Sequence, residues 1–511
     1  MNGAEHLLRT ALGAGIDTCF ANPGTSEMQL VAALDTVGGL RSVLGLFEGV
    51  CTGAADGYAR MTGRPALTLL HLGPGLANGL ANLHNARRAR SPVVNLVGDH
   101  ATWHLAADAP LTSDIESLAR PVGWVRRARS TALLARDFAD TVEASYGPAA
   151  QPATLIVPQD FTWEDASGDQ VKIVRPTVAA PKDANVAAAV ESLKTGAAAV
   201  LFVGGLALGE RGLRAAARIA ATTGCRVLHE FMPARIERGA GLPSLPRLPY
   251  FPEQAGAALE GATSLVLVGV REPVAFFGYP GMRSDVKPEG CKVLSLASPE
   301  EDAELALEAV AEALGAAPLA IVDASRPQKP TGSLDTDTLC QAIAALQPEG
   351  AIIVDESATS GLSYFPYAAG SPRHTVMTLT GGAIGQGLPN AVGAAVACPD
   401  RRVIAFQADG SGMYTLQSLW TMARESLDVT VVVCANRLYR ILQFELMRAG
   451  NYEPGPRARG LTDLSQPALD WVALARGMGV PAVSVTTADE LCTALARSLA
   501  EPGPSLIEAL V

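Results

Sequence analysis

The sequence lacks the cysteine spacing of metal and redox sites. Its eight cysteines are scattered along the chain, and no two of them form a Cys-x-x-Cys pair. This distribution speaks against zinc ribbons and thiol redox motifs. It predicts a protein of a reducing compartment, where cysteines remain thiols.

Basic charge is also scarce. The chain has 40 Lys and Arg against 51 Asp and Glu, a formal net charge of −11. Because a nucleic-acid partner requires a concentrated positive surface, the composition argues against one. No apolar stretch has membrane-spanning length, and the first residues lack the basic start and apolar core of a signal peptide. We therefore expect a cytoplasmic protein with neither a nucleic-acid nor a membrane partner.

Apolar residues are abundant, at 48% of 511 residues, which suits a chain with more than one packed core. Short runs rich in β-branched residues alternate with Ala-rich stretches, the pattern of parallel sheets covered by helices on both faces. The clearest predicted strands are residues 91–97, 198–203, 264–268, 351–354, 402–406 and 429–434.

Two Pro-containing segments, 176–181 and 325–333, have the composition of linkers. They predict an α/β protein with three doubly wound parallel-sheet domains. The predicted domains comprise residues 1–170, 182–325 and 334–511.

The most informative segment of the sequence spans residues 402–442. A predicted strand leads into Asp-Gly-Ser-Gly at 409–412, a helix-like stretch follows at 414–424, and the next strand ends before Asn436. Asn436 lies 27 residues after Asp409, which fits one βαβ crossover, so both side chains are expected at the carboxyl edge of neighbouring strands. Their oxygens suit Mg²⁺, whose remaining ligands would be a backbone carbonyl, water and diphosphate oxygens.

These residues resemble the thiamine diphosphate motif of decarboxylases and acetolactate synthases, which begins with Gly-Asp-Gly and ends with Asn over a segment of this length. The resemblance implies that Mg²⁺ is bound by Asp409, Asn436 and the backbone oxygen of Leu438. It implies further contacts to the cofactor by Gly410, Ser411 and Tyr439.

The chain departs from this motif at two positions. Ala408 replaces the first glycine, and Arg437 follows the asparagine where glycine, which tolerates positive φ, is frequent. The residues alone are also compatible with a nucleotide-free strand-turn-helix, in which Asp409 and Gly410 form a turn and Asn436 is a cap.

A second glycine-rich loop, residues 379–389, precedes a helix expected to begin near Pro389. In the family that the chain resembles, a bulky apolar residue of this loop holds the cofactor in a bent conformation. Ile384 occupies that position, and the resemblance implies that the backbone near Gly382 faces the pyrimidine ring. The alternative is a tight turn between domains.

Glu48 stands at the entry of a predicted helix rich in Gly and Ala. Taken alone, it is a charge that stabilises a helix N-terminus. Its context, which ends in Ala-Asp-Gly-Tyr-Ala at 55–59, resembles the cofactor-activating region of the same family. The resemblance implies that the Glu48 carboxyl group bonds to the pyrimidine ring of thiamine diphosphate and activates it.

Glu48 and Asp409 are 361 residues apart, although both are predicted to contact one cofactor. In the resembling family the N-terminal domain of one subunit faces the C-terminal domain of its partner. The resemblance therefore implies a homodimer or homotetramer with active sites between subunits.

Two further loops are expected to face the same site as Glu48. Asn-Pro-Gly-Thr-Ser-Glu at 22–27 and His-Leu-Gly-Pro-Gly at 71–75 resemble loops of benzoylformate decarboxylase. There the first loop binds substrate through a hydroxyl, and the second supplies a histidine for proton transfer. Thr25 and His71 occupy these positions, although a lone histidine is usually structural.

The middle segment departs from benzoylformate decarboxylase. Residues 272–280 contain no histidine, and Phe276 and Phe277 are predicted to form an apolar wall of the substrate site. The Gly-rich stretch 203–209 lacks the Gly-Lys-Ser/Thr of a phosphate loop. These residues neither support nor exclude FAD, which acetolactate synthases hold in this domain.

The leading hypothesis is a non-oxidative decarboxylase or carboligase similar to benzoylformate decarboxylase. It would act on a small 2-oxo acid with thiamine diphosphate and Mg²⁺. An acetolactate synthase-like carboligase is the nearest alternative. A catalytically silent cofactor-binding homologue and a flavin-dependent oxidoreductase of the same family remain as further alternatives.

Overall fold

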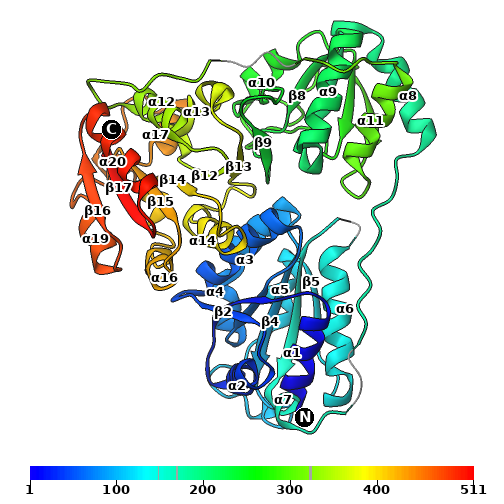
Figure 1. Cartoon of the computed structure of the whole chain (residues 1–511), viewed down its shortest axis with the longest axis vertical. Helices are drawn as coiled ribbons and strands as arrows, with labels where there is room; N and C mark the ends of the chain where they lie inside the picture. Colours follow the sequence, from blue (N-terminus) through cyan, green and yellow to red (C-terminus); the bar gives the residue numbers. More distant parts are fainter. Residues whose placement is uncertain (148, 168–170, 321–324) are drawn as a thin grey trace. The chain divides into compact units, whose positions relative to one another are not determined.

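The computed structural model describes residues 1–147, 149–167, 171–320 and 325–511. They form two compact units, which can be followed by colour in Figure 1. The first unit combines the N-terminal and C-terminal parts of the chain, residues 1–175, 326–368 and 379–511. The second unit contains the middle of the chain, residues 176–325 and 369–378.

The N-terminal part of the first unit is built on a parallel sheet. Among the described residues its strands are β1 (Thr18–Asn22), β2 (Arg41–Leu44), β3 (Leu67–Leu70), β4 (Val93–Asp99), β5 (Trp124–Arg127) and β6 (Pro152–Pro158). Their order is β2-β1-β3-β4-β6-β5, so the winding of the chain reverses between β1 and β3. In open parallel sheets, ligands bind at the carboxyl ends of the strands at such a reversal.

Helices cover both faces of this sheet. One face carries α1 (Gly3–Gly13), α2 (Met28–Val37) and α6 (Leu134–Tyr146). There Leu7 and Phe138 pack against Leu69 and Leu96 of the strands in one buried apolar cluster. Burying each such side chain stabilises the fold by about 1.5–3 kcal/mol. The other face carries α3 (Glu48–Thr62), α4 (Leu72–Ala89) and α5 (Ile115–Ala119).

The second unit contains a smaller parallel sheet with the order β11-β10-β7-β8. Its strands are β7 (Ala199–Val203), β8 (Arg226–His229), β10 (Ser264–Val268) and β11 (Lys292–Ala297). Its helices include α8 (Asp183–Leu193), α9 (Glu210–Thr223), α10 (Pro252–Leu259) and α11 (Ala303–Ala313). In the same unit β9 (Ile236–Arg238) pairs antiparallel with β13 (His374–Thr378).

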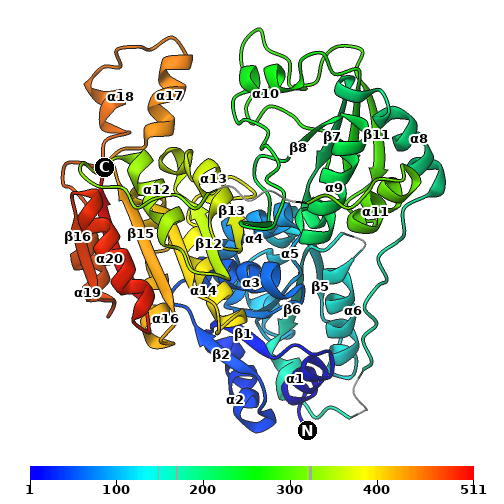
Figure 2. The ribbon, with the colours of Figure 1, turned by 45° about the horizontal axis from the view of Figure 1, so that its top comes forward.

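The C-terminal part of the first unit contains a third parallel sheet, in which strands follow the order β16-β17-β15-β14-β12. These strands are β12 (Ala351–Glu356), β14 (Val403–Ala408), β15 (Val429–Ala435), β16 (Ala482–Val485) and β17 (Ser505–Leu510). Its main helices are α12 (Thr336–Leu346), α14 (Gly387–Ala397), α16 (Ser418–Arg424), α19 (Trp471–Gly477) and α20 (Ala488–Ala500). In Figure 2, α17 (Arg440–Arg448) and α18 (Pro456–Gly460) extend away from this sheet.

Three parallel sheets with helices confirm the predicted α/β fold class, and all six predicted strands are present. The helix expected at 414–424 begins only at Ser418, because residues Asp409–Gly412 form a separate turn of helix, α15. The boundaries of the three predicted domains stay predictions, and one of them, residue 170, lies outside the described residues.

Helices α3 and α14 join the N-terminal and C-terminal parts of the first unit. A Cβ atom added at Gly57 of α3 would lie 2.3 Å from the Asn390 carbonyl oxygen. One added at Gly393 of α14 would lie 1.9 Å from the Ala54 carbonyl oxygen. Because only glycine permits so close an approach, the small residues of these helices are explained by the crossing.

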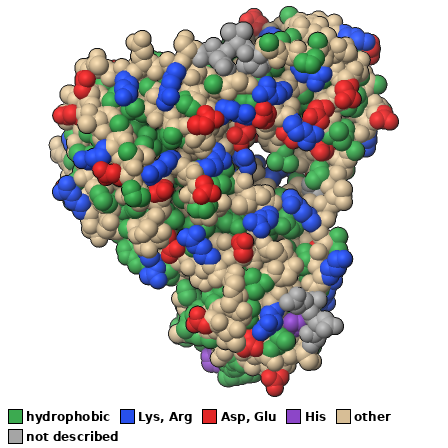
Figure 3. Space-filling model, in the orientation of Figure 1, with side chains coloured by type: hydrophobic (Ala, Val, Ile, Leu, Met, Phe, Trp, Pro, Cys, Tyr) green, Lys and Arg blue, Asp and Glu red, His purple; other side chains and the backbone are tan. Residues whose placement is uncertain are grey.

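Charged side chains are dispersed over the face of the molecule that Figure 3 draws. On the face drawn in Figure 3, Lys and Arg side chains are interspersed with Asp and Glu side chains. None of the helices in the described residues is long and apolar enough to cross a membrane.

Candidate active site

Helix α4 carries a row of asparagines that organises the candidate site. Asn78, Asn82 and Asn85 lie on one face of the helix, since side chains three and four residues apart point the same way. Asn78 Nδ2 donates a hydrogen bond to Glu48 Oε2 at 2.9 Å. Asn82 Nδ2 donates to the Gly385 carbonyl at 3.3 Å, and Asn85 Nδ2 donates to the Ala383 carbonyl at 2.7 Å. One helix therefore holds both Glu48 and the loop that contains Ile384.

Glu48 and His71, the two residues predicted to be catalytic, are neighbours in the structure. Glu48 is the first residue of α3 and is only 8% exposed, whereas His71 follows β3 and caps α4. A Cβ atom added at Gly75 would lie 3.0 Å from Glu48 Oε1 and 3.4 Å from His71 Cβ. Because Gly75 has no side chain, the Glu48 carboxylate and His71 can both lie close to it.

The loop that carries Thr25 also contacts His71. Thr25 is exposed and begins the short helix η1 (Thr25–Glu27), directly after β1. The preceding Gly24 lies against the imidazole, because a Cβ atom added there would be 2.3 Å from the His71 ring. The structure therefore places the loop of Thr25 against His71 through Gly24, and the roles predicted for Thr25 and His71 stay predictions.

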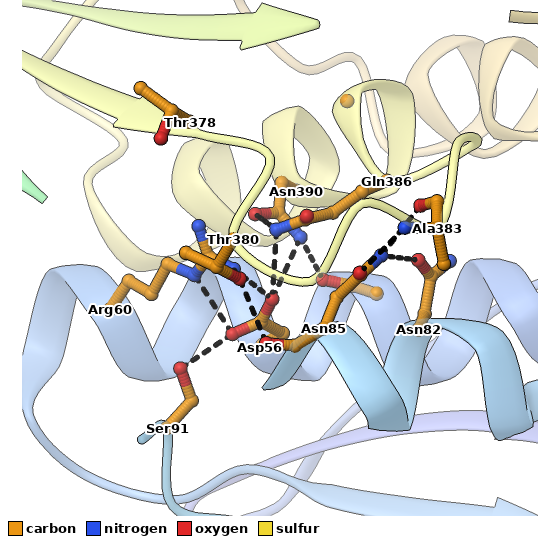
Figure 4. A network of polar contacts seen from close by, with 12 residues as sticks. Asp56, Arg60, Asn82, Asn85, Ser91, Thr378, Thr380, Ala383, Gln386 and Asn390 are labelled. Atoms are coloured by element: carbon orange, nitrogen blue, oxygen red, sulfur yellow. Dashed lines mark hydrogen bonds and ion pairs between the residues drawn. The ribbon is translucent and has the colours of Figure 1, made fainter. Parts of the chain in front are cut away.

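A buried polar network ties α3 to the loop before α14 (Figure 4). Asp56 and Arg60 form an ion pair at 2.7 Å, with both side chains almost fully buried. Gln386 Nε2 donates to Asp56 at 3.1 Å, and Arg60 Nη2 donates to Thr380 Oγ1 at 2.9 Å. A buried ion pair is stable only when its remaining polar atoms are satisfied, and residues on both sides of the interface do this here.

Glu356, at the end of β12, holds the same loop from the other side. Its carboxylate accepts backbone N–H groups from Gly385 and Gly387, both at 2.7 Å, and from Gln386 at 3.2 Å. It also accepts from Gln407 Nε2 at 3.0 Å. Burial raises the pKa of Glu356, and these hydrogen bonds oppose that shift.

The backbone of this loop requires glycine on both sides of Ile384. Gly382 has φ +76° and Gly385 has φ +95°, conformations that other residues rarely adopt. Ile384 itself is half-buried. The loop is therefore fixed by its own glycines, by α4 and by Glu356, which suits a segment that positions a ligand.

Asp409 and Asn436 meet at the carboxyl edge of the third sheet, as predicted. Asp409 is 2% exposed, and its carboxylate accepts the N–H groups of Gly410 at 2.8 Å and Arg437 at 2.7 Å. Asn436 Oδ1 accepts the N–H of Leu438 at 2.9 Å. Burial raises the pKa of Asp409, and the two backbone N–H groups lower it.

The donor set of this edge suits Mg²⁺. Within the described residues no Lys or Arg side chain forms an ion pair with Asp409, so a cation would compensate its buried charge. Those residues also contain no group of three or more His, Cys, Asp or Glu arranged to hold a metal. A site built from one carboxylate, one amide and a backbone oxygen is of a different kind and agrees with the preference of Mg²⁺ for oxygen.

The remaining predicted cofactor residues surround Asp409. Ser411 Oγ accepts a hydrogen bond from Gln407 Nε2 at 2.6 Å. A Cβ atom added at Gly410 would lie 2.4 Å from the Tyr439 ring, so Tyr439 covers this turn. Arg437 has φ +57°, so the backbone keeps the conformation typical of the glycine that the motif usually has there.

Phe276 and Phe277 belong to the second unit. Their rings are 5.0 Å apart, edge to face, and the residues are 42% and 51% exposed. They form an aromatic surface, and its predicted role as a wall of the substrate site stays a prediction.

The sequence interpretation missed the three asparagines of α4 and Glu356. The asparagines have a signal in hindsight, since their spacing of four and three residues is that of one helix face. Glu356 has a weaker one, a carboxylate at the end of a predicted buried strand.

Comparison with known proteins identifies the class. Residues 1–118 match the family described as thiamine pyrophosphate enzyme, N-terminal TPP binding domain, and residues 358–509 match its C-terminal TPP binding domain. These segments cover more than half of the chain. The protein therefore belongs to the thiamine pyrophosphate enzyme family and is a thiamine diphosphate-dependent enzyme.

Individual relatives match nearly the whole chain. A Mycobacterium tuberculosis protein provisionally named acetolactate synthase large subunit IlvX is 52% identical, over 100% of this chain and 99% of that protein. Benzoylformate decarboxylase of Pseudomonas aeruginosa is 29% identical, over 97% of this chain and 96% of its own. The structure of a 4-hydroxybenzoylformate decarboxylase from Rhodococcus jostii RHA1 covers 100% of this chain with a TM-score of 0.88 and 24% identity, which shows the same fold.

Proposed function

We propose that the protein is a non-oxidative decarboxylase or carboligase of a small 2-oxo acid, similar to benzoylformate decarboxylase, that uses thiamine diphosphate with Mg²⁺. The observation that carries the proposal is the arrangement around α4. His71 caps this helix, Asn78 bonds to Glu48, and Asn82 and Asn85 bond to the loop of Ile384. The names of the relatives support 2-oxo acid chemistry.

Residues of the C-terminal part would hold the cofactor. In this proposal the Mg²⁺ ligands are Asp409, Asn436 and the backbone oxygen of Leu438. Contacts to the diphosphate and the rings come from Gly410, Ser411, Tyr439, Gly382 and Ile384. When bound, thiamine diphosphate supplies a nucleophilic carbon that adds to the substrate carbonyl and accepts the electron pair left by departing CO₂.

The N-terminal residues act on protons and on the substrate. Glu48, desolvated at the start of α3 and held by Asn78, keeps a proton at the pyrimidine ring. The Thr25 hydroxyl binds the substrate carboxylate, and His71 transfers a proton to or from the reacting carbon. Phe276 and Phe277 supply an apolar wall.

A carboligase of the acetolactate synthase type is the second candidate. It is favoured by the name of the relative that is 52% identical to the chain. The two outcomes differ in what captures the carbon after CO₂ leaves, a proton or a second carbonyl compound. Separate measurement of the aldehyde and of the condensation product distinguishes them.

The test is a panel of 2-oxo acids, including pyruvate, benzoylformate and longer chains, incubated with protein, Mg²⁺ and thiamine diphosphate. We expect CO₂ release from at least one of them. Glu48→Gln should lower this turnover by at least about 100-fold, because a general acid is lost, and should leave cofactor binding intact. Glu501→Gln, an exposed glutamate of the same unit, is the control. The proposal is wrong if the panel yields no product or if Glu48→Gln stays within threefold of the wild type.

The assembly is a further part of the proposal. In a homodimer or homotetramer with active sites between subunits, Glu48 of one chain would face Asp409 of its partner. The α4 contacts would then fix the N-terminal and C-terminal parts of each chain to one another and would not enclose one cofactor within a chain. Mixing and reassembling the inactive variants Glu48→Gln and Asp409→Ala should then restore activity, because one site of each mixed dimer has both wild-type residues. Sites formed within one chain would stay inactive in every mixture. Cytoplasmic location is proposed on the cysteines, all of which are free thiols in the structure.

A further inference from the structure

His71 has a fully buried carboxylate behind it. His71 Nδ1 lies 2.8 Å from Glu27 Oε2 and 3.1 Å from Ser26 Oγ. The Glu27 side chain is 0% exposed, whereas that of His71 is 22% exposed. The ring is therefore held at Nδ1, and part of the His71 side chain remains accessible to solvent.

The Glu27 carboxylate is fixed by its surroundings. It accepts the Gly24 N–H at 2.7 Å and the Ser26 hydroxyl at 2.6 Å, in addition to His71 Nδ1. It lies directly on the backbone of β4, because a Cβ atom added at Gly98 would be 1.7 Å from Glu27 Oε1. No Lys or Arg side chain of the described residues pairs with it, so His71 is the group that can compensate its charge.

These contacts decide which ring nitrogen carries a proton in neutral His71. A carboxylate can only accept, and the Ser26 hydroxyl proton is directed to Glu27, so both oxygens near Nδ1 are acceptors. Nδ1 must therefore be the protonated nitrogen. Within the described residues Nε2 has no hydrogen-bond partner, which leaves it as the nitrogen that gains and loses a proton.

The position of this pair in the fold matches that role. Glu27 follows β1 and His71 follows β3, the two strands between which the winding of the sheet reverses. Glu27, which follows β1, thus orients His71, which follows the neighbouring strand β3. Gly75 brings Glu48 to the same place.

We propose that Glu27 is a positioning residue that fixes His71 as the Nδ1–H tautomer and thereby makes Nε2 the proton donor of the reaction. This rests on the proposed function. After CO₂ leaves, the Nε2–H bond breaks and its proton goes to the substrate carbon, to which the electron pair accepted by the cofactor returns as the new C–H bond. The imidazole becomes neutral with Nδ1–H retained, and water returns a proton to Nε2. Glu27 does not itself touch the substrate.

Nitrogen-15 NMR of histidine-labelled protein tests the tautomer without any substrate. The chain has seven histidines, and His71→Gln identifies the signals of His71 by their loss. The wild type should show the Nδ1–H form alone. Glu27→Gln should give a mixture of both tautomers, because an amide can donate as well as accept, and Ser26→Ala should change the spectrum less. A His71 spectrum that is the same in the wild type and in Glu27→Gln would overturn the proposal.

Kinetics tests the consequence on the substrate found with the panel. Glu27→Gln should lower kcat by about 10- to 100-fold, part of what a general acid contributes, with KM and thiamine diphosphate affinity within threefold of the wild type. Glu27→Asp should recover part of the loss, and Glu501→Gln should lose nothing. Equal losses in Glu27→Gln and Glu27→Asp, with weaker cofactor binding, would show a merely structural residue. If the wild type turns over no 2-oxo acid, the proposed function fails, while the NMR result still decides the role of Glu27 toward His71.

Discussion

Two turns of the molecule share the same strand–turn–helix connection and differ in the side chains that lie against their backbone. In the second unit, Gly204 and Gly205 follow β7, and in the C-terminal part of the first unit, residues 409–412 follow β14. Each turn leads from a parallel strand toward a helix. In each, the neighbouring strand ends in a polar residue, Glu230 after β8 and Asn436 after β15.

The turn after β7 is closed by its own carboxylate. Glu230 Oε1 accepts the Gly205 N–H at 2.6 Å. A Cβ atom added at Gly204 would lie 2.6 Å from the same oxygen. Backbone N–H groups at such a turn can bind phosphate. Here a negative side chain already takes that position, so the turn is satisfied internally.

The turn after β14 has the opposite character. Its carboxylate is Asp409, which lies within the turn, and the neighbouring strand supplies the neutral amide of Asn436. No second negative charge is added, and the oxygens of Asp409 and Asn436 are those that a divalent cation prefers. The comparison teaches that one side chain on the adjacent strand separates a structural turn from the metal and diphosphate site that we propose at a turn of the same topology.

Of the substitutions that test this comparison, Asp409→Ala should cause the largest change, a loss of thiamine diphosphate affinity. It removes the buried carboxylate that we propose binds Mg²⁺. Loss of residues that merely support a metal ligand weakens metal binding by about 10- to 100-fold, so loss of a ligand should weaken thiamine diphosphate binding by more than about 100-fold. Isothermal titration with thiamine diphosphate in the presence of Mg²⁺ measures the change.

The matched control is Asp400→Ala, at an exposed position just before β14. Its cofactor affinity should equal that of the wild type. If Asp409→Ala binds thiamine diphosphate within threefold of the wild type, the two turns do not differ in the way proposed.

The features predicted from the sequence are those with local causes. The alternation of apolar runs predicted the strands, because a buried parallel strand needs consecutive apolar residues. Asp409 and Asn436 were predicted as neighbours because a single βαβ crossover has a characteristic length. Glu48 was predicted at the start of a helix, and α3 does begin there.

The features that the sequence did not predict depend on contacts between side chains and distant backbone groups, which the types of the residues involved do not reveal. Glu356 acts on backbone N–H groups about 30 residues away, and backbone groups are present whatever the side chain. Asn82 and Asn85 act on carbonyl groups about 300 residues away. At Arg437 the motif suggested glycine, and the backbone adopts the positive φ of glycine at a cost of about 1–2 kcal/mol. There the tertiary contact to Asp409 overrides local preference.

Glu230→Gln is the converse of Asp409→Ala and should have a smaller effect of a different kind. The amide oxygen can still accept the Gly205 N–H, but the hydrogen bond is no longer charge-assisted, so the unfolding free energy should fall by about 1 kcal/mol. Chemical denaturation measures this loss, with exposed Glu312→Gln on α11 as the control. Thiamine diphosphate affinity should stay within twofold of the wild type, since the turn after β7 is not its proposed site.

The purified wild type should also show no flavin absorbance, because the Glu230 carboxylate would repel a phosphate at this turn. Bound FAD that Glu230→Gln releases would instead show that both turns serve ligands, and the distinction between them would fail.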